Sequence, residues 1–116
     1  MSIAIPARGE VWSVDLNPSP HPEEIGKIRP CLVVSNTDYN RGPMNRVVVV
    51  PITSKLRSIN WRVRLIPDEG GVKQASQIIC DMVRYISKQR LREHWGVVSE
   101  NTMCEVEDRL LTLLSL

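Results

Sequence analysis

Two polar side chains stand at the ends of two strongly apolar segments and are the first candidates for chemistry. Arg29 directly precedes segment 30–35 (PCLVVS), and Thr53 directly follows segment 46–52 (RVVVVPI). Strand ends are rigid supports for a site, so Arg29 and Thr53 approach each other at one rim if the two segments pair. A guanidinium and a hydroxyl placed together in this way can bind an anion.

Neither residue belongs to a familiar catalytic signature. The sequence contains no phosphate-binding glycine loop, no G-x-S-x-G and no H-E-x-x-H. Each residue also has a purely structural alternative. Arg29 can form an ion pair with Glu23 or Glu24, and the Thr53 hydroxyl can hydrogen-bond within its own turn. The chemistry therefore depends on what else surrounds the rim.

The cysteines and histidines do not have the spacing of metal ligands. Cys31, Cys80 and Cys104 are odd in number and form no C-x-x-C, and His21 and His94 lie far apart in the chain. A disulfide framework or a structural zinc site is therefore not expected. We expect buried, reduced thiols and no bound metal.

The middle of the chain is basic. Residues 27–64 carry eight Lys and Arg against one Asp, a net charge of +7, whereas residues 1–26 and 99–116 each carry −3. Eleven of the fifteen cations are arginine, whose guanidinium matches phosphate geometry. This distribution favours an anionic partner such as a nucleic acid, unless the charges are dispersed over solvated strand faces.

Short apolar or alternating segments predict a mainly β structure. Alternation indicates half-buried strands, and β-branched runs indicate central strands that are buried on both faces. Pro51 lacks a backbone donor, so its strand should end there in a bulge or at an edge. The predicted strands comprise residues 10–16, 30–35, 46–52, 61–66, and 76–80 with 82–86 as either one bent strand or two.

The connections and the C-terminal segment complete this pattern. Residues 17–26 form a proline-rich loop, residues 36–45 have a turn composition, and residues 88–93 are expected to form a short helical turn. A helix begins near Ser99, a typical N-cap, and should close over the strands. Its apolar stripe consists of Met103, Val106, Leu110 and Leu113, widened by Leu111 and Leu114.

Length and composition predict one domain, residues 1–116, built as a small and mostly antiparallel barrel with a C-terminal helix. No segment approaches the ~20 apolar residues that span a bilayer, and the N-terminus does not have the pattern of a signal peptide. We therefore expect a cytoplasmic protein without a membrane partner.

Four ordered segments resemble the MazF/PemK family of toxin endoribonucleases from type II toxin–antitoxin systems. Together they extend over nearly the whole chain and keep the order and spacing of the family. They are residues 8–16 (RGEVWSVDL), 24–36 (EIGKIRPCLVVSN), 49–54 (VVPITS) and 83–91 (VRYISKQRL).

The resemblance implies a fold, an assembly and a reaction. The fold is an SH3-like barrel with a C-terminal helix, assembled as a homodimer. The reaction is sequence-specific cleavage of single-stranded RNA, without a metal or other cofactor, by attack of a ribose 2′-OH on the adjacent phosphorus. It leaves a cyclic phosphate and a 5′-OH, and the family's catalytic arginine and threonine correspond to Arg29 and Thr53.

The resemblance also implies an RNA-binding surface. Trp61 has two interpretations, because it can stack on a base or pack in the core with Val63 and Leu65. Asp81 is followed by Met82, where many relatives have a glutamine, so the cleavage sequence of a relative does not transfer. The residues assigned to RNA binding are Lys27, Asn36, Ser54, Lys55, Leu56, Arg57, Trp61, Asp81 and Arg84.

The expected protein partner is a MazE-like antitoxin with a disordered acidic tail that occupies the basic groove. Two alternatives have the same fold. One is a non-catalytic toxin that poisons a protein such as DNA gyrase, against which the spacing of Arg29 and Thr53 argues. The other is a barrel that binds RNA or a peptide without cleaving it.

Overall fold

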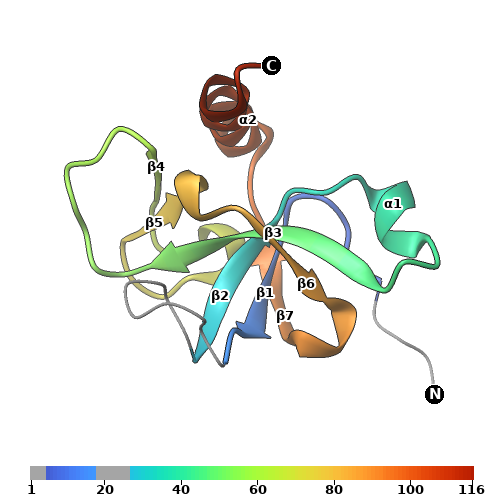
Figure 1. The fold of residues 1–116 in the computed structure, drawn as a ribbon. Coiled ribbons are helices and arrows are strands. Elements are labelled where there is room, and N and C mark those ends of the chain that lie inside the picture. Colours follow the sequence, from blue (N-terminus) through green and yellow to red (C-terminus); the bar gives the residue numbers. More distant parts are fainter. Residues whose placement is uncertain (1–4, 18–26) are drawn as a thin grey trace.

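Seven strands and two α-helices make up the described part of the chain, residues 5–17 and 27–116 of the computed structural model (Figure 1). The α-helices are α1 (Thr37–Arg41) and α2 (Glu100–Leu114), and three short 3-10 turns are η1 (Glu69–Gly71), η2 (Cys80–Met82) and η3 (Lys88–Arg90). The strands are β1 (Glu10–Asp15), β2 (Ile28–Val33), β3 (Arg46–Thr53), β4 (Arg62–Leu65), β5 (Ser76–Ile79), β6 (Arg84–Ser87) and β7 (Leu91–Val97).

The described strands form one antiparallel sheet in the order β4-β5-β3-β2-β1-β7, with β6 also paired to β3. Alternate residues of each strand point to opposite faces, so each face has its own apolar cluster. One cluster contains Leu32, Val50, Val63 and Ile78 and is covered by Val106 of α2. The other contains Val14, Cys31, Val49 and Ile86. The expectation of a mainly β fold with a C-terminal helix is confirmed.

The two central strands were predicted correctly, but β3 does not end at Pro51. It continues to Thr53 and keeps β2 as its partner, with Pro51 opposite Cys31. On its other side, β3 pairs with β6 through Val49 and with β5 from Ile52 onward. Pro51 therefore lies between the part of β3 that pairs with β6 and the part that pairs with β5. Its missing backbone donor interrupts neither of these two ladders.

Three further segments differ from the sequence-based expectations. The helical turn expected over residues 88–93 is limited to η3, and the strand β7 follows at once and pairs with β1. The turn expected over residues 36–45 contains α1. Residues 76–86 form two separate strands, β5 and β6, joined by η2.

The C-terminal helix begins as predicted, because Ser99 Oγ accepts a hydrogen bond from the backbone N–H of Thr102 at 3.1 Å. Val106 is fully buried, and Met103 and Leu110 pack against the same apolar cluster. Leu111 and Leu114, which were expected to widen this apolar stripe, are about half exposed. In the described residues, neither helix is long and apolar enough to cross a membrane.

Polar side chains tie together one end of the central strands, which we call the anchored end (Arg8, Ser35, Asn36, Thr37 and Asn40). The buried Asn40 side chain donates to Pro6 O at 2.9 Å, and Ser35 Oγ accepts from Val48 N at 3.0 Å. The guanidinium of Arg8 bridges Val34 O and Glu107 of α2. These contacts fix the N-terminal segment and α2 to the ends of β2 and β3.

Candidate active site

Arg29 and Thr53 lie at the same end of the neighbouring strands β2 and β3. The β2–β3 ladder pairs Cys31 with Pro51, and continuing the same register by two residues sets Arg29 against Thr53. Residues two apart on a strand share a face, so both side chains lie on the face of Cys31 and Pro51. Arg29 is exposed and Thr53 is half-buried, so a ligand can reach both.

The same row continues across two more strands. Thr53 pairs with Gln77 of β5, and Gln77 pairs with Arg64 of β4. Directly paired residues share a face of a sheet. Arg29, Thr53, Gln77 and Arg64 therefore form one polar row across β2, β3, β5 and β4, which we call the site row.

Gln77 was missed by the sequence analysis, and it holds the connection between β3 and β4 beside Thr53. Its Nε2 donates to Arg57 O at 3.0 Å, and its Oε1 accepts from Arg57 N at 3.0 Å. Arg62 Nη1 donates both to Gln77 Oε1 and to Lys55 O, each at 3.0 Å. The cations of this connection are thus fixed at one end of the site row.

Thr53 also takes part in this local order, because its Oγ1 accepts a hydrogen bond from Lys55 N at 3.0 Å. This is the turn hydrogen bond that the structural alternative predicts for Thr53. The hydroxyl hydrogen does not take part in that bond, so Thr53 can still donate to an anion. The structural and chemical interpretations of Thr53 are therefore compatible.

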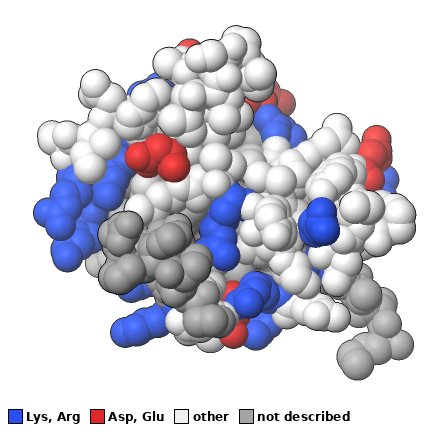
Figure 2. All heavy atoms as spheres, viewed as in Figure 1, with Lys and Arg blue, Asp and Glu red and all other residues white. Residues whose placement is uncertain are grey.

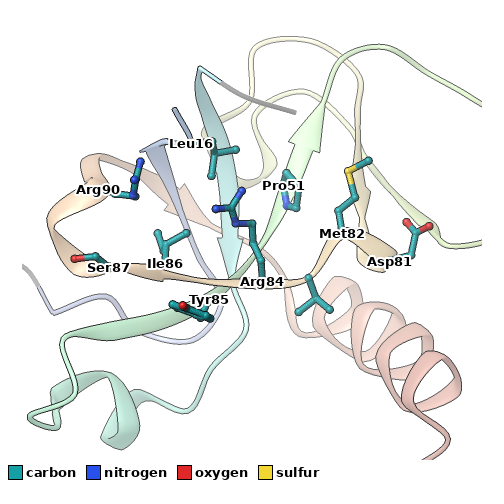
Figure 3. A pocket seen from close by; sticks show the side chains of 10 residues that line it. Leu16, Pro51, Asp81, Met82, Arg84, Tyr85, Ile86, Ser87 and Arg90 are labelled. Atoms are coloured by element: carbon teal, nitrogen blue, oxygen red, sulfur yellow. The ribbon is translucent and has the colours of Figure 1, made fainter. Parts of the chain in front are cut away.

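A cleft of about 610 Å³ opens on the face that carries Pro51, between β6 and the central strands (Figure 3). Leu16, Pro51 and Met82 give it apolar walls, and Arg84 and Arg90 give it charge. Figure 3 shows the guanidinium of Arg84 between Leu16 and Pro51, whereas Tyr85 points away to the other side of β6. The cleft is therefore apolar with a cation at its centre.

The positive charge of Arg84 also affects the pKa of a buried thiol, that of Cys31. Burial raises the pKa of Cys31 to about 12, and the positive charge of Arg84 opposes that rise. Cys80 likewise has its pKa raised to about 11, mainly by burial. At neutral pH these two thiols are protonated and unreactive, so they contribute packing rather than a nucleophile.

Most of the other residues assigned to RNA binding lie around the site row. Lys27 is exposed just before β2, and Ser54, Lys55, Leu56 and Arg57 are exposed in the connection after Thr53. Arg84 lies in the cleft, and Asp81 lines the cleft from η2.

Asn36 and Trp61 lie elsewhere. Asn36 is at the anchored end, where its Oδ1 accepts from Asp38 N at 2.7 Å and caps α1. Trp61 is half-buried in a shallow hollow with Arg109 and Thr112 of α2. Because Trp61 directly precedes β4 and alternates with Val63, it belongs to the sheet face opposite the site row, which favours the packing interpretation.

Part of the predicted site lies outside the described residues. The proline-rich loop, with His21 and with the glutamates offered as partners of Arg29, falls in residues 18–26. Among the residues that the structure does describe, no group of three or more His, Cys, Asp or Glu is arranged to hold a metal ion.

The side chains of Arg29 and Thr53 can stabilise negative charge that develops on one oxygen of a bound polyanion. Arg29 presents a guanidinium and Thr53 a hydroxyl from opposed strand ends, so both donors are held by the sheet. Figure 2 shows Lys and Arg side chains gathered along the side where the β3–β4 connection lies in Figure 1. A ligand with successive negative charges matches that distribution.

Comparisons with known proteins agree with these observations. Residues 7–114 match the family described as "PemK-like, MazF-like toxin of type II toxin-antitoxin system". Endoribonuclease PemK of Escherichia coli is 37% identical, over 93% of this chain and 81% of that protein. Endoribonuclease MazF9 of Mycobacterium tuberculosis is 31% identical, over 94% of this chain and 96% of that protein.

Solved structures match over almost the whole fold. A MazF of Deinococcus radiodurans superimposes with a TM-score of 0.84 at 25% identity, covering 97% of this chain and 99% of that one. An endoribonuclease from a mycobacterial species in complex with its cognate antitoxin gives a TM-score of 0.78 at 29% identity, covering 96% of each chain. On these grounds the chain belongs to the PemK/MazF-like family of type II toxin–antitoxin toxins.

Proposed function

We propose that this chain is a toxin endoribonuclease that cleaves single-stranded mRNA at specific sequences and thereby inhibits translation. The observation that carries this proposal is that Arg29 and Thr53 lie at the same end of the paired strands β2 and β3, on one face of the sheet. Relatives that match nearly the whole chain are endoribonucleases.

In the proposed reaction the ribose 2′-OH attacks the neighbouring phosphorus. The bond from phosphorus to the 5′-oxygen then breaks, giving a 2′,3′-cyclic phosphate and a 5′-OH. Negative charge accumulates on the non-bridging oxygens in the transition state, and the Arg29 guanidinium stabilises it there. Thr53 donates its hydroxyl hydrogen to one of these oxygens or orients the 2′-OH.

Arg29 is a poor general base, because the pKa of an arginine lies above 12. Its role in the proposed mechanism is electrostatic, together with hydrogen-bond donation toward the leaving 5′-oxygen. No metal ion is required in this scheme, since the guanidinium supplies the positive charge that a metal would otherwise provide.

The substrate chain runs over the exposed cations beside the site row. Lys27, just before β2, and Arg29 are exposed, and so are Ser54, Lys55, Leu56 and Arg57 in the connection after Thr53. Arg84 places a further cation in the cleft next to Pro51. Phosphate contacts of this kind provide affinity and register, while base contacts provide the sequence preference.

Two partners complete the proposal. An antitoxin partner is supported by solved toxin–antitoxin complexes of similar fold. We propose that its acidic tail occupies the basic surface and excludes RNA, and that the toxin acts as a homodimer. Both contacts are expected to weaken as salt rises where charge contributes to them.

One experiment tests the reaction directly. The purified chain is incubated with a long single-stranded RNA in the presence of EDTA, and the products are mapped at nucleotide resolution. Discrete cuts ending in a cyclic phosphate and a 5′-OH support the proposal. Intact RNA that is retarded in a gel indicates a non-catalytic RNA-binding protein, and intact, unbound RNA indicates a toxin with another target.

A further inference from the structure

A second hollow lies beyond Gln77, at the far end of the site row. Four arginines line it, from the β3–β4 connection, from β4 and from α2, and its volume is about 360 Å³. We call it the arginine hollow (Arg57, Arg62, Arg64 and Arg109). Its remaining lining residues are Ser58, Ile59, Asn60 and Gln77, so no carboxylate is among the residues that line it.

Two of the four arginines of the hollow, Arg62 and Arg109, are held in place by hydrogen bonds to other groups of the chain. Arg109 Nε donates to Asn60 O at 3.0 Å, while its Nη1 lies 3.3 Å from Asp108 Oδ2 at the edge. Arg62 is fixed through Lys55 O and Gln77 Oε1. Guanidinium groups that are fixed in advance lose less side-chain entropy when they bind an anion.

One donor in the hollow has no acceptor. Arg62 Nε is buried, and it is the one buried side-chain nitrogen or oxygen in the described residues without a hydrogen-bond partner. Buried polar groups normally have a partner, so an unpaired guanidinium nitrogen calls for a specific reason. Because this nitrogen is enclosed by the protein, a ligand oxygen in the hollow reaches it only if the Arg62 side chain shifts.

The hollow is continuous with the proposed catalytic pair. Thr53, Gln77 and Arg64 are directly opposed on three adjacent strands, so Thr53 and Arg64 are two strand spacings apart, roughly 10 Å. A polyanion bound at Thr53 reaches Arg64 without leaving this face of the sheet. Figure 2 shows the same side of the molecule rich in Lys and Arg.

We propose that the arginine hollow binds backbone phosphates of the RNA segment that flanks the cleaved bond. This inference rests on the proposed endoribonuclease function and adds a second binding site to it. The hollow favours phosphate over peptide carboxylate for two reasons. Four guanidinium groups around a polar concavity suit the three-dimensional set of oxygens on successive phosphates, and the site row leads directly to the proposed cleavage point.

The test compares short and extended RNAs with four proteins. The shorter RNA is the minimal fragment that carries one mapped cleavage sequence, and the longer versions extend it by about ten nucleotides on the 5′ or the 3′ side. The proteins are the wild type, Arg64→Gln, the double variant Arg64→Gln/Arg109→Gln, and the control Arg41→Gln. Arg41 lies in α1, away from the arginine hollow, and its replacement removes the same charge as Arg64→Gln.

The proposal expects a difference that depends on RNA length. The double variant should raise KM for one of the longer RNAs about ten-fold more than it raises KM for the shortest RNA, with a smaller change in kcat. The salt dependence of binding to the longer RNA should become less steep by about 0.7 for each lost phosphate contact. Arg41→Gln should change none of these values.

Other outcomes overturn the inference in distinguishable ways. If the double variant cleaves short and long RNA like the wild type, the hollow is not an RNA site even though the chain is a ribonuclease. If RNA cleavage is unchanged but an acidic antitoxin tail inhibits the variant less strongly, the hollow serves the antitoxin instead. If the wild type cleaves no RNA at all, the proposed function itself fails.

Discussion

The two ends of the β2–β3 pair use polar residues in opposite ways. At the anchored end, Ser35 and Asn40 bond to each other and to backbone groups, and Asn40 is completely buried. At the site end, Arg29 is exposed, and the Thr53 hydroxyl hydrogen is available to a ligand. The polar groups of the first end stabilise the fold, and those of the second are presented to solvent.

This comparison shows why polar residues at strand ends are ambiguous in a sequence. Arg29 and Asn36 flank the same buried strand and belong to the same segment 24–36, yet Asn36 caps α1 while Arg29 lies on the site row. The two residues differ in the groups that they contact in the folded chain.

The largest effect is expected from removing the opposed pair. Arg29→Ala and Thr53→Ala should each lower the rate of RNA cleavage by about a hundred- to a thousand-fold, because each removes a fixed donor to the developing oxyanion. The urea unfolding midpoint should stay close to that of the wild type. Cleavage by either variant at near the wild-type rate would show that the site end does not carry the chemistry.

The anchored end should show the reverse behaviour. Asn40→Ala removes the donor to Pro6 O and the acceptor of the Ser35 hydroxyl hydrogen, and should lower the free energy of unfolding by about 2 kcal/mol. The kcat per folded molecule should not change at temperatures well below unfolding. Urea denaturation and single-turnover cleavage measure the two quantities, and a loss of kcat with unchanged stability would contradict the division between the ends.

The central strands and the placement of Arg29 and Thr53 at one rim were predictable because their signals are local. Runs of Val and Ile indicate strands that are buried on both faces, and two such strands satisfy their backbone groups by pairing, which brings Arg29 and Thr53 to one rim. β7 was not predictable in this way. Of its seven residues only Leu91 is buried, so no alternation marks it, and its pairing with β1 includes shifts of register.

Gln77 illustrates the same limit at the site. It lies in a segment whose division into β5 and β6 stayed open in the sequence, so its neighbours across the sheet were unknown. Its interactions are with residues 13 to 24 positions away in the chain, namely Thr53, Arg57, Arg62 and Arg64. No spacing rule predicts such contacts, although a glutamine inside an apolar strand is itself a signal of a polar partner across the sheet.

Replacing Gln77 tests whether the site row works as a unit. Gln77→Leu removes the hydrogen bonds to Arg57 and Arg62 and should raise KM for RNA about ten-fold with a smaller change in kcat, because the cations after Thr53 lose their fixed position. Gln74→Leu is the matched control, because Gln74 is exposed and precedes β5, outside the site row. Equal kinetics for the two variants would show that the functional part of the site row is limited to Arg29 and Thr53.

The smallest effect concerns pH at the start of α2. Burial alone would raise the pKa of Glu69, but hydrogen bonds from Thr102 and Ser99 lower it overall. A lowered folded-state pKa stabilises the fold above the ordinary carboxyl pKa, and this contribution is lost as pH falls through the folded pKa. The wild type should therefore lose stability below about pH 4.5 relative to Glu69→Gln, measured by urea titration. A stability difference that is constant across this range would show that the hydrogen bonds from Ser99 and Thr102 do not lower the pKa of Glu69.

The pairing of β1 with β7 has a consequence for synthesis of the chain. Glu10 pairs with Val97, whereas the β2–β3 ladder closes between Val33 and Val49. Short loops close at a lower entropic cost, so a growing chain can align Arg29 with Thr53 long before β1 finds its last neighbour. Until β7 leaves the ribosome, β1 remains an open edge that can join other chains. Incomplete products of this gene are therefore expected to aggregate rather than to act as partial enzymes.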